Sequence, residues 1–77
     1  NKAQTLFKEK KYELSINQLE EIIDNNPNWG KAYLLRGKVL SEYIDEYAGK
    51  DDLIKAVRLG GENTRTEAIK LLSDSNN

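Results

Sequence analysis

The chain has 77 residues, which is enough for one small domain. It contains neither cysteine nor histidine, so disulfide bonds, thiolate chemistry and the commonest general base and metal ligand are excluded. Twelve basic and 13 acidic residues nearly balance, which argues against a nucleic-acid partner, because such proteins cluster positive charge on one face. No apolar stretch reaches the roughly 18 residues of a membrane span, so we expect no membrane partner.

Apolar residues recur at helical spacing in the first third of the chain. One stripe predicts a helix over residues 2–9 and consists of Ala3, Leu6 and Phe7. A second stripe predicts a helix over residues 12–25 and consists of Tyr12, Ile16, Leu19, Ile22 and Ile23. Residues 24–28 are polar around the single proline, Pro27, and this composition is typical of a turn that ends a helix.

The middle of the chain predicts two more helices, each with one apolar face. The first extends over residues 29–43, with a stripe formed by Tyr33, Gly37, Leu40 and Ile44. The second extends over residues 46–59, with a stripe formed by Gly49, Leu53, Ala56 and Val57. Gly60 and Gly61 follow directly, as expected at the C-terminus of a helix.

The last segment predicts a fifth helix over residues 64–73, capped by Asn63 or Thr64. Its apolar side consists of Ala68, Ile69 and Leu72. Residues 74–77 have the composition of a polar tail. No segment of useful length alternates between polar and apolar residues, so the predicted fold class is all-α.

The sequence partly matches itself when it is shifted by 34 residues. Small residues coincide at two positions, where Ala3 pairs with Gly37 and Ser15 pairs with Gly49. Larger apolar residues coincide elsewhere, in the pairs Leu6 and Leu40, Leu19 and Leu53, Ile22 and Ala56, and Ile23 and Val57. Two helices in a period of this length are typical of the tetratricopeptide repeat.

The chain resembles the tetratricopeptide repeat family over about residues 1–63. A small residue followed three positions later by a leucine, as in the first helix of that family's unit, occurs at Ala3 and again at Gly37. Pro27 stands where the family's helix-ending proline belongs. The second unit departs from the pattern, with Gly61 in place of the proline and Glu46 in place of the aromatic residue that matches Tyr12.

This resemblance implies antiparallel helix-turn-helix repeats in a single domain over residues 1–77. The first unit, shortened at its start, would cover residues 1–27, the second residues 28–63, and a terminal helix residues 64–73. The small residues at positions 3, 15, 37 and 49 should let the two helices of each unit approach closely. Inside a helix, the glycine at position 49 should cost about 1 kcal/mol.

No arrangement of side chains in the sequence predicts catalysis, a cofactor or a metal. Residues 24–28 place oxygen ligands at alternate positions, as a calcium loop does, but Trp29 stands where the loop needs glycine. The serines have no histidine to activate them. We therefore expect no enzyme, no cofactor and no metal.

The resemblance also implies that the first helix of each unit lines a concave surface that binds a protein or peptide segment. The residues at its binding positions are Gln4, Lys8, Lys31, Leu34, Lys38, Ser41 and Arg65. Independently of the family, Lys31, Leu34 and Lys38 are three and four positions apart and so share one helix face, apart from the predicted buried stripe. Basic residues around a leucine favour a partner segment that carries carboxylates beside an apolar anchor.

Other interpretations remain open at this point. The same face can be an ordinary solvated surface with one exposed leucine. Because at least three repeats are usually needed for stability, the chain can also be a self-association module that forms a homo-oligomer or belongs to a longer solenoid. Its first residue is asparagine rather than methionine, so we expect a segment of a longer protein or a mature form. Trp29, just before the third helix, is expected to clamp one unit against the next, the alternative being direct contact with a ligand. No cellular compartment follows from the sequence.

Overall fold

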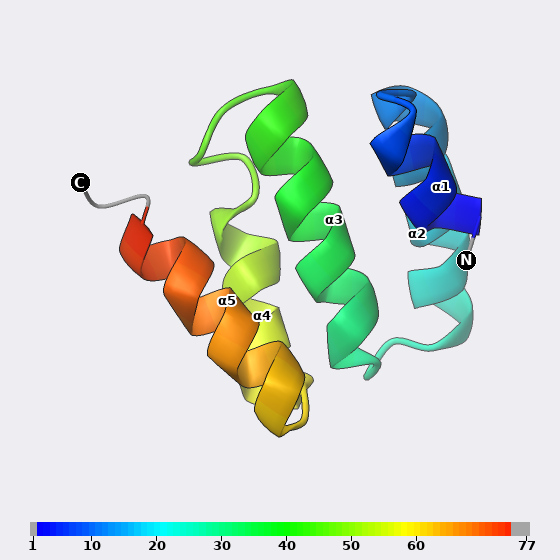
Figure 1. The fold of residues 1–77 in the computed structure, drawn as a ribbon. Helices are drawn as coiled ribbons and strands as arrows, with labels where there is room; N and C mark the ends of the chain where they lie inside the picture. Colours follow the sequence, from blue (N-terminus) through cyan, green and yellow to red (C-terminus); the bar gives the residue numbers. More distant parts are fainter. Residues whose placement is uncertain (1, 75–77) are drawn as a thin grey trace.

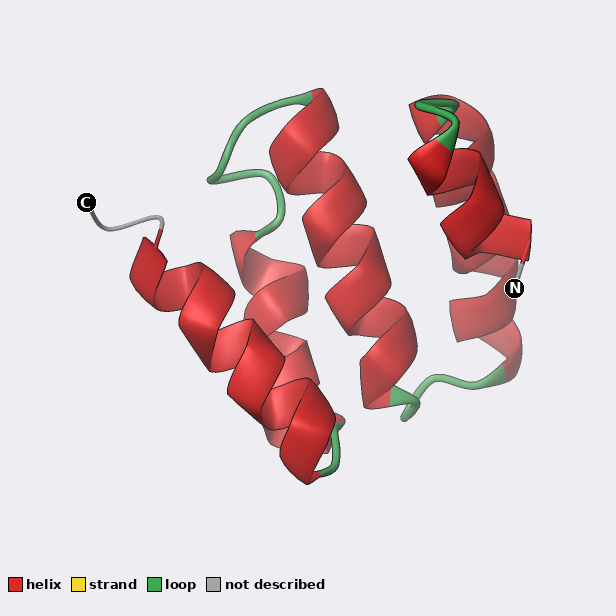
Figure 2. Cartoon of the chain, viewed as in Figure 1, coloured by secondary structure: helices red, strands yellow, loops and turns green. Residues whose placement is uncertain are grey.

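The described part of the chain, residues 2–74, contains five helices and no strand in this computed structural model. The helices are α1 (Lys2–Lys8), α2 (Tyr12–Asn25), α3 (Gly30–Tyr43), α4 (Lys50–Leu59) and α5 (Glu62–Asp74). Each helix packs beside the next one in the sequence and runs antiparallel to it, with α3 in the middle (Figure 1). Short loops make all the connections (Figure 2). The predicted all-α fold class is confirmed.

The first three helices begin and end within one residue of their predicted bounds, but α4 begins four residues later than predicted. Residues 45–49 form turns instead, in which the Asp45 carboxylate accepts a hydrogen bond of 3.0 Å from the Ala48 N–H group. Gly49 therefore precedes α4 rather than lying inside it, and the expected helix-interior cost does not apply.

The predicted start of α5 is also wrong, because the helix begins at Glu62. The Arg65 N–H group donates to the Gly61 carbonyl oxygen at 2.9 Å, which closes the first helical turn immediately after the glycines. No cap by Asn63 or Thr64 is therefore needed. Asp74, assigned to the tail, is the last residue of α5, and the remaining tail residues, 75–77, lie outside the described residues.

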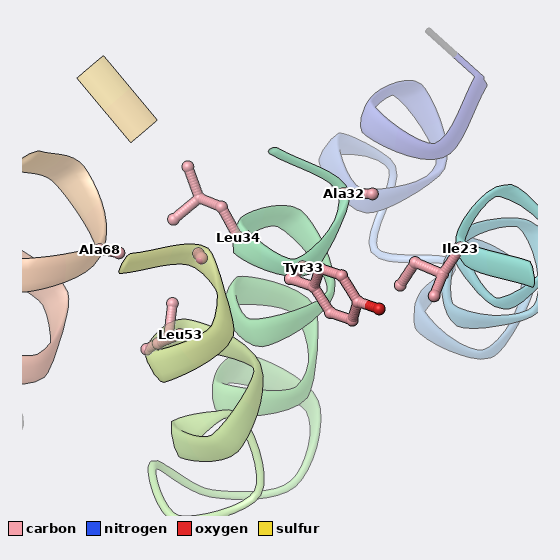
Figure 3. Packing of buried hydrophobic residues seen from close by; sticks show 7 residues of the cluster. Ile23, Ala32, Tyr33, Leu34, Leu53 and Ala68 are labelled. Carbon is pink, nitrogen blue, oxygen red and sulfur yellow. The ribbon is translucent and has the colours of Figure 1, made fainter. Parts of the chain in front are cut away.

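Two apolar clusters form the core, and α3 contributes to both. One lies between α1, α2 and α3 and consists of Ala3, Leu19, Leu35 and Val39. The other joins the end of α2 to α3, α4 and α5 and consists of Ile23, Ala32, Tyr33, Leu34, Leu53, Ala56 and Ala68 (Figure 3). The predicted stripe of the third helix is correct for Tyr33 and Gly37, but Leu40 is only partly buried and Ile44 is 60% exposed.

Small residues mark the points where consecutive helices come closest. The Ser15 hydroxyl donates to the Ala3 carbonyl oxygen at 2.9 Å, and both residues are fully buried. A Cβ atom on Gly49 would overlap the carbonyl oxygen of Gly37, and one on Gly37 would lie 2.9 Å from the Leu53 side chain. The close approach predicted for positions 3, 15, 37 and 49 is therefore confirmed.

The turn after α1 has a backbone shape that favours glycine, yet lysine occupies it. Lys10 has φ of 62°, in the left-handed region. The Lys11 N–H group donates to the Leu6 carbonyl at 2.8 Å and the Lys10 N–H group to the Phe7 carbonyl at 3.0 Å. These two bonds are the pattern of a Schellman C-cap, whose left-handed position is usually glycine.

We expect Lys10→Gly to raise the free energy of unfolding by about 0.5–1 kcal/mol, because it removes the left-handed penalty but adds freedom to the unfolded chain. Urea unfolding followed by circular dichroism measures the change. Lys11→Gly is the control, since Lys11 has φ of −91° and gains nothing from glycine. An equal response of both variants would contradict the assignment of strain to Lys10.

Candidate functional site

Two adjoining pockets open along α3 between α1 and α5. The first, of about 340 Å³, is lined by residues that include Gln4, Trp29, Lys31, Leu34, Leu35 and Glu67. The second, of about 410 Å³, is lined by residues that include Phe7, Ser41, Glu42, Glu46, Leu71 and Asp74. Lys38 lines both pockets. We call the two pockets together the α3 groove.

Five of the seven predicted binding residues lie in this groove. Four of them line the first pocket, namely Gln4, Lys31, Leu34 and Lys38. Ser41 lines the second. The spacing of residues along α3 therefore identified side chains that do line the same groove.

The other two predicted residues, Lys8 and Arg65, line neither pocket. The Arg65 guanidinium is turned toward α4, where its Nε donates to the Val57 carbonyl oxygen at 3.2 Å. Lys8 is exposed in the last turn of α1, where a positive charge suits the helix C-terminus. The groove is therefore less basic than the sequence predicted.

Leu34 is the residue whose environment differs most from its prediction. The sequence placed Leu34 on a helix face apart from the buried stripe, but only 6% of its surface is exposed. It belongs to the same cluster as Ala68 of α5, and Figure 3 shows its side chain projecting away from Ile23 on α2. Because α5 packs over this side of α3, Leu34 forms part of the groove floor and also supports the fold.

The charges along the groove change sign from one end to the other. At the Trp29 end, Lys31 is exposed and forms no ion pair with any residue in the range 2–74. In the middle, the Lys38 ammonium is 2.6 Å from the Glu67 carboxylate, which neutralises it. The far end carries the carboxylates Glu42, Glu46 and Asp74. The positive surface is thus confined to the neighbourhood of Lys31.

Trp29 was predicted to clamp the units together, yet 44% of its surface is exposed. It lines the first pocket and also a shallow surface beside Asn26, Pro27 and Asn28. The tight turn after α2 holds it there, since the Trp29 N–H group donates to the Asn26 carbonyl at 3.1 Å. The sequence favoured the structural role over ligand contact, so Trp29 was not among the predicted binding residues, although the structure places it at the groove.

An ion pair on the other side of α3, between Arg36 and Asp52, stabilises the fold. The Arg36 guanidinium binds Asp52 through two hydrogen bonds of 2.7 and 2.9 Å, and Asp52 is only 6% exposed. This hydrogen bonding to Asp52 raises the pKa of Arg36. A raised pKa of a basic group means that its stabilising effect is lost only as the pH rises through that pKa, in strongly alkaline solution. The positive charge of Arg36 that holds α3 to α4 therefore persists into strongly alkaline solution.

Within residues 2–74, no group of three or more carboxylates, cysteines or histidines could hold a metal ion. None of the described helices is long and apolar enough to cross a membrane. Comparison of the chain with family models, curated proteins and solved structures gave no match.

Proposed function

We propose that the chain is a non-catalytic binding module, related to tetratricopeptide repeats, that holds a protein or peptide segment in the α3 groove. The observation that carries this proposal is the half-exposed Trp29 beside the free ammonium group of Lys31, at one end of a groove that continues along α3. Aromatic residues with an exposed face are enriched where proteins bind other proteins.

The relation to tetratricopeptide repeats is supported by equivalent contacts one period apart. Ala3 meets Ser15 where the first two helices come closest, and Gly37 meets Gly49 where the next two do so. The second pair lies 34 positions after the first, and this distance is the length of the repeat. In such repeats the helices equivalent to α1, α3 and α5 line the ligand surface, and these three helices supply most of the residues that line the groove.

The partner that fits best carries an apolar or aromatic side chain followed or preceded by a carboxylate. The apolar side chain would lie against Trp29 and the floor formed by Leu34 and Leu35. The carboxylate would pair with Lys31. A uniformly acidic segment fits less well, because Glu42, Glu46 and Asp74 would repel its other end.

The test is selection of binders from a random peptide library displayed on phage, followed by titration of synthetic peptides. Trp29 is the only tryptophan, so its fluorescence reports directly on the groove. We expect selected peptides to contain an aromatic residue near a carboxylate and to shift the emission to shorter wavelength as Trp29 loses water.

Lys31→Glu should weaken binding of these peptides about tenfold or more, with an effect that shrinks at high salt. Lys70→Glu is the matched control, since Lys70 is exposed on α5 and lines neither pocket. Circular dichroism should show both variants folded. Equal binding by the parent and Lys31→Glu, or peptides that leave the tryptophan emission unchanged, would remove the groove as the binding site.

A further inference from the structure

The loop between α3 and α4 exposes several large apolar side chains at one end of the molecule. Tyr43 is 42% exposed, Ile44 60% and Tyr47 75%, all within five consecutive residues. Single exposed apolar residues are normal, but three within five residues, at the end of α3 and in the loop after it, are typical of a surface that another molecule covers. Neither core cluster needs these side chains.

The same loop is acidic. Glu42, Asp45 and Glu46 carry three negative charges there, and no lysine or arginine lies between residues 42 and 49. In the sequence, Ile44 lies between Glu42 and Asp45, and Glu46 directly precedes the exposed Tyr47. We call residues 42–47 the acidic loop.

A basic segment lies beside the acidic loop, at the same end of the molecule. It is the turn between α1 and α2, residues 8–11, which has three lysines and one glutamate and is exposed throughout; we call it the basic turn. Figure 1 shows both connections at the upper end of the molecule, the basic turn above α2 and the acidic loop leading from the top of α3 toward α4. Tyr12 and Tyr43 join them, with stacked rings whose centroids are 5.3 Å apart.

Hydrogen bonds fix the relative position of the acidic loop and the basic turn. The Tyr43 hydroxyl donates to Glu13 at 2.6 Å, and the Tyr12 hydroxyl donates to Glu42 at 3.1 Å. The bond to Glu13 raises the pKa of Tyr43, so its hydroxyl stays a donor through neutral and mildly alkaline pH. The two oppositely charged surfaces therefore face outward in a fixed arrangement.

The strained backbone of the basic turn is an independent observation. Lys10 occupies a left-handed position that glycine fills at lower cost, and its side chain makes no ion pair within the described part of the chain. An observed backbone outlier at an exposed position is grounds for a functional hypothesis. The feature that glycine would lack here is the positive charge.

We propose that this end of the molecule is a self-complementary interface, through which two copies of the chain pair about a two-fold axis. The acidic loop of one copy would lie on the basic turn of the other, and the same contact would form a second time by symmetry. Ile44 and Tyr47 would be buried at the centre, with the charges around them as a polar rim.

A second copy fits this surface better than an unrelated partner does. Both halves of the complementary charge pattern are on the same end of one chain, so a two-fold pairing satisfies both together. A basic partner would match the acidic loop but be repelled by Lys8, Lys10 and Lys11. An acidic partner would meet the opposite conflict with Glu42, Asp45 and Glu46.

The first test is sedimentation equilibrium of the parent chain from about 1 µM to about 1 mM, the range of weak interfaces, at low and high salt. We expect a monomer at the low end, a dimer at the high end and weaker association at high salt. Tyr47→Ser should weaken the dimer about tenfold or more, because the side chain is mostly exposed in the monomer and buried in the pair. A monomer at all concentrations would overturn the proposal.

Charge reversal gives a sharper test. One variant makes the basic turn acidic, Lys10→Asp with Lys11→Glu, and the other removes the net negative charge of the acidic loop, Asp45→Asn with Glu46→Lys. Asparagine at position 45 keeps the hydrogen-bond acceptor for the Ala48 N–H group, so the loop should keep its shape. Each variant alone should dimerise about tenfold or more weakly than the parent, and an equimolar mixture should form a heterodimer.

The controls separate this interface from the α3 groove. Lys70→Glu should dimerise like the parent, since Lys70 belongs to neither charged segment. Selected peptides should still shift the Trp29 emission of the variant with Lys10→Asp and Lys11→Glu, because neither lysine lines the groove. Parent-like dimers from both reversed variants, or no association in their mixture, would overturn the two-fold pairing and leave the groove proposal intact.

Discussion

Leu19→Ala should leave most of the chain unfolded in water without denaturant. Leu19 is 1% exposed and lies at the centre of the cluster between α1, α2 and α3, against Ala3, Leu35 and Val39. Truncating a buried leucine leaves a cavity and costs about 2–5 kcal/mol. A domain of this length without disulfides or metals holds only about 3–5 kcal/mol of stability, so the loss consumes most of it.

Far-ultraviolet circular dichroism and urea titration measure this effect. Leu14→Ala is the matched control, because Leu14 is on the same helix but 56% exposed, and it should change stability by no more than about 0.5 kcal/mol. Leu40→Ala should fall between the two, since Leu40 is only partly buried. A Leu19→Ala variant within about 0.5 kcal/mol of the parent would contradict the position of Leu19 in the core.

The sequence predicted the first three helices closely, because each has a clear apolar stripe and a clear stop signal. The start of α4 was missed for a local reason. Gly49 was read as part of the stripe from its spacing, but it is the residue at which α4 crosses α3, just before the helix begins. The signal for a turn was Asp45, whose side chain accepts the Ala48 N–H group in competition with helix formation.

The candidate site was predicted in part, and the differences at Arg65 and Leu34 have a common origin in α5. Residues on one face of α3 can be found from spacing alone, and these did meet in the groove. The rotation of α5 depends instead on the two-residue connection at Gly60 and Gly61, which differs from the longer connection between α2 and α3. That rotation turns Arg65 toward α4, brings Glu67 to Lys38, and places α5 over the side of Leu34.

A substitution at Leu34 therefore cannot distinguish an effect on binding from an effect on folding. From the sequence, Leu34→Ala would mainly speed dissociation of a bound segment. Since Leu34 is buried with Ala68, its truncation should also lower the stability of the whole domain by about 2–5 kcal/mol. Lys31, which is exposed and outside the core, is the residue that tests binding alone.

Gly49→Ala is the second substitution from which we expect a large loss of stability. A Cβ atom at position 49 would overlap the carbonyl oxygen of Gly37 and the hydroxyl oxygen of Ser41. The Ser41 side chain can rotate away, but the Gly37 carbonyl belongs to the backbone of α3 and cannot move without separating α3 from α4. We expect a cost of about 3 kcal/mol, the upper part of the range for overpacked interiors.

Gly61→Ala is its matched control, because a Cβ atom at position 61 would have no atom within 4 Å and neither glycine has a positive φ. It should leave stability unchanged or raise it by up to about 1 kcal/mol through the unfolded state. Urea unfolding of both variants gives the comparison. The equivalent position in the first unit is Ser15, which is fully buried and donates to Ala3, so that crossing accommodates a side chain. A Gly49→Ala variant as stable as the Gly61→Ala variant would mean that α3 and α4 are no closer at position 49 than α1 and α2 are at position 15.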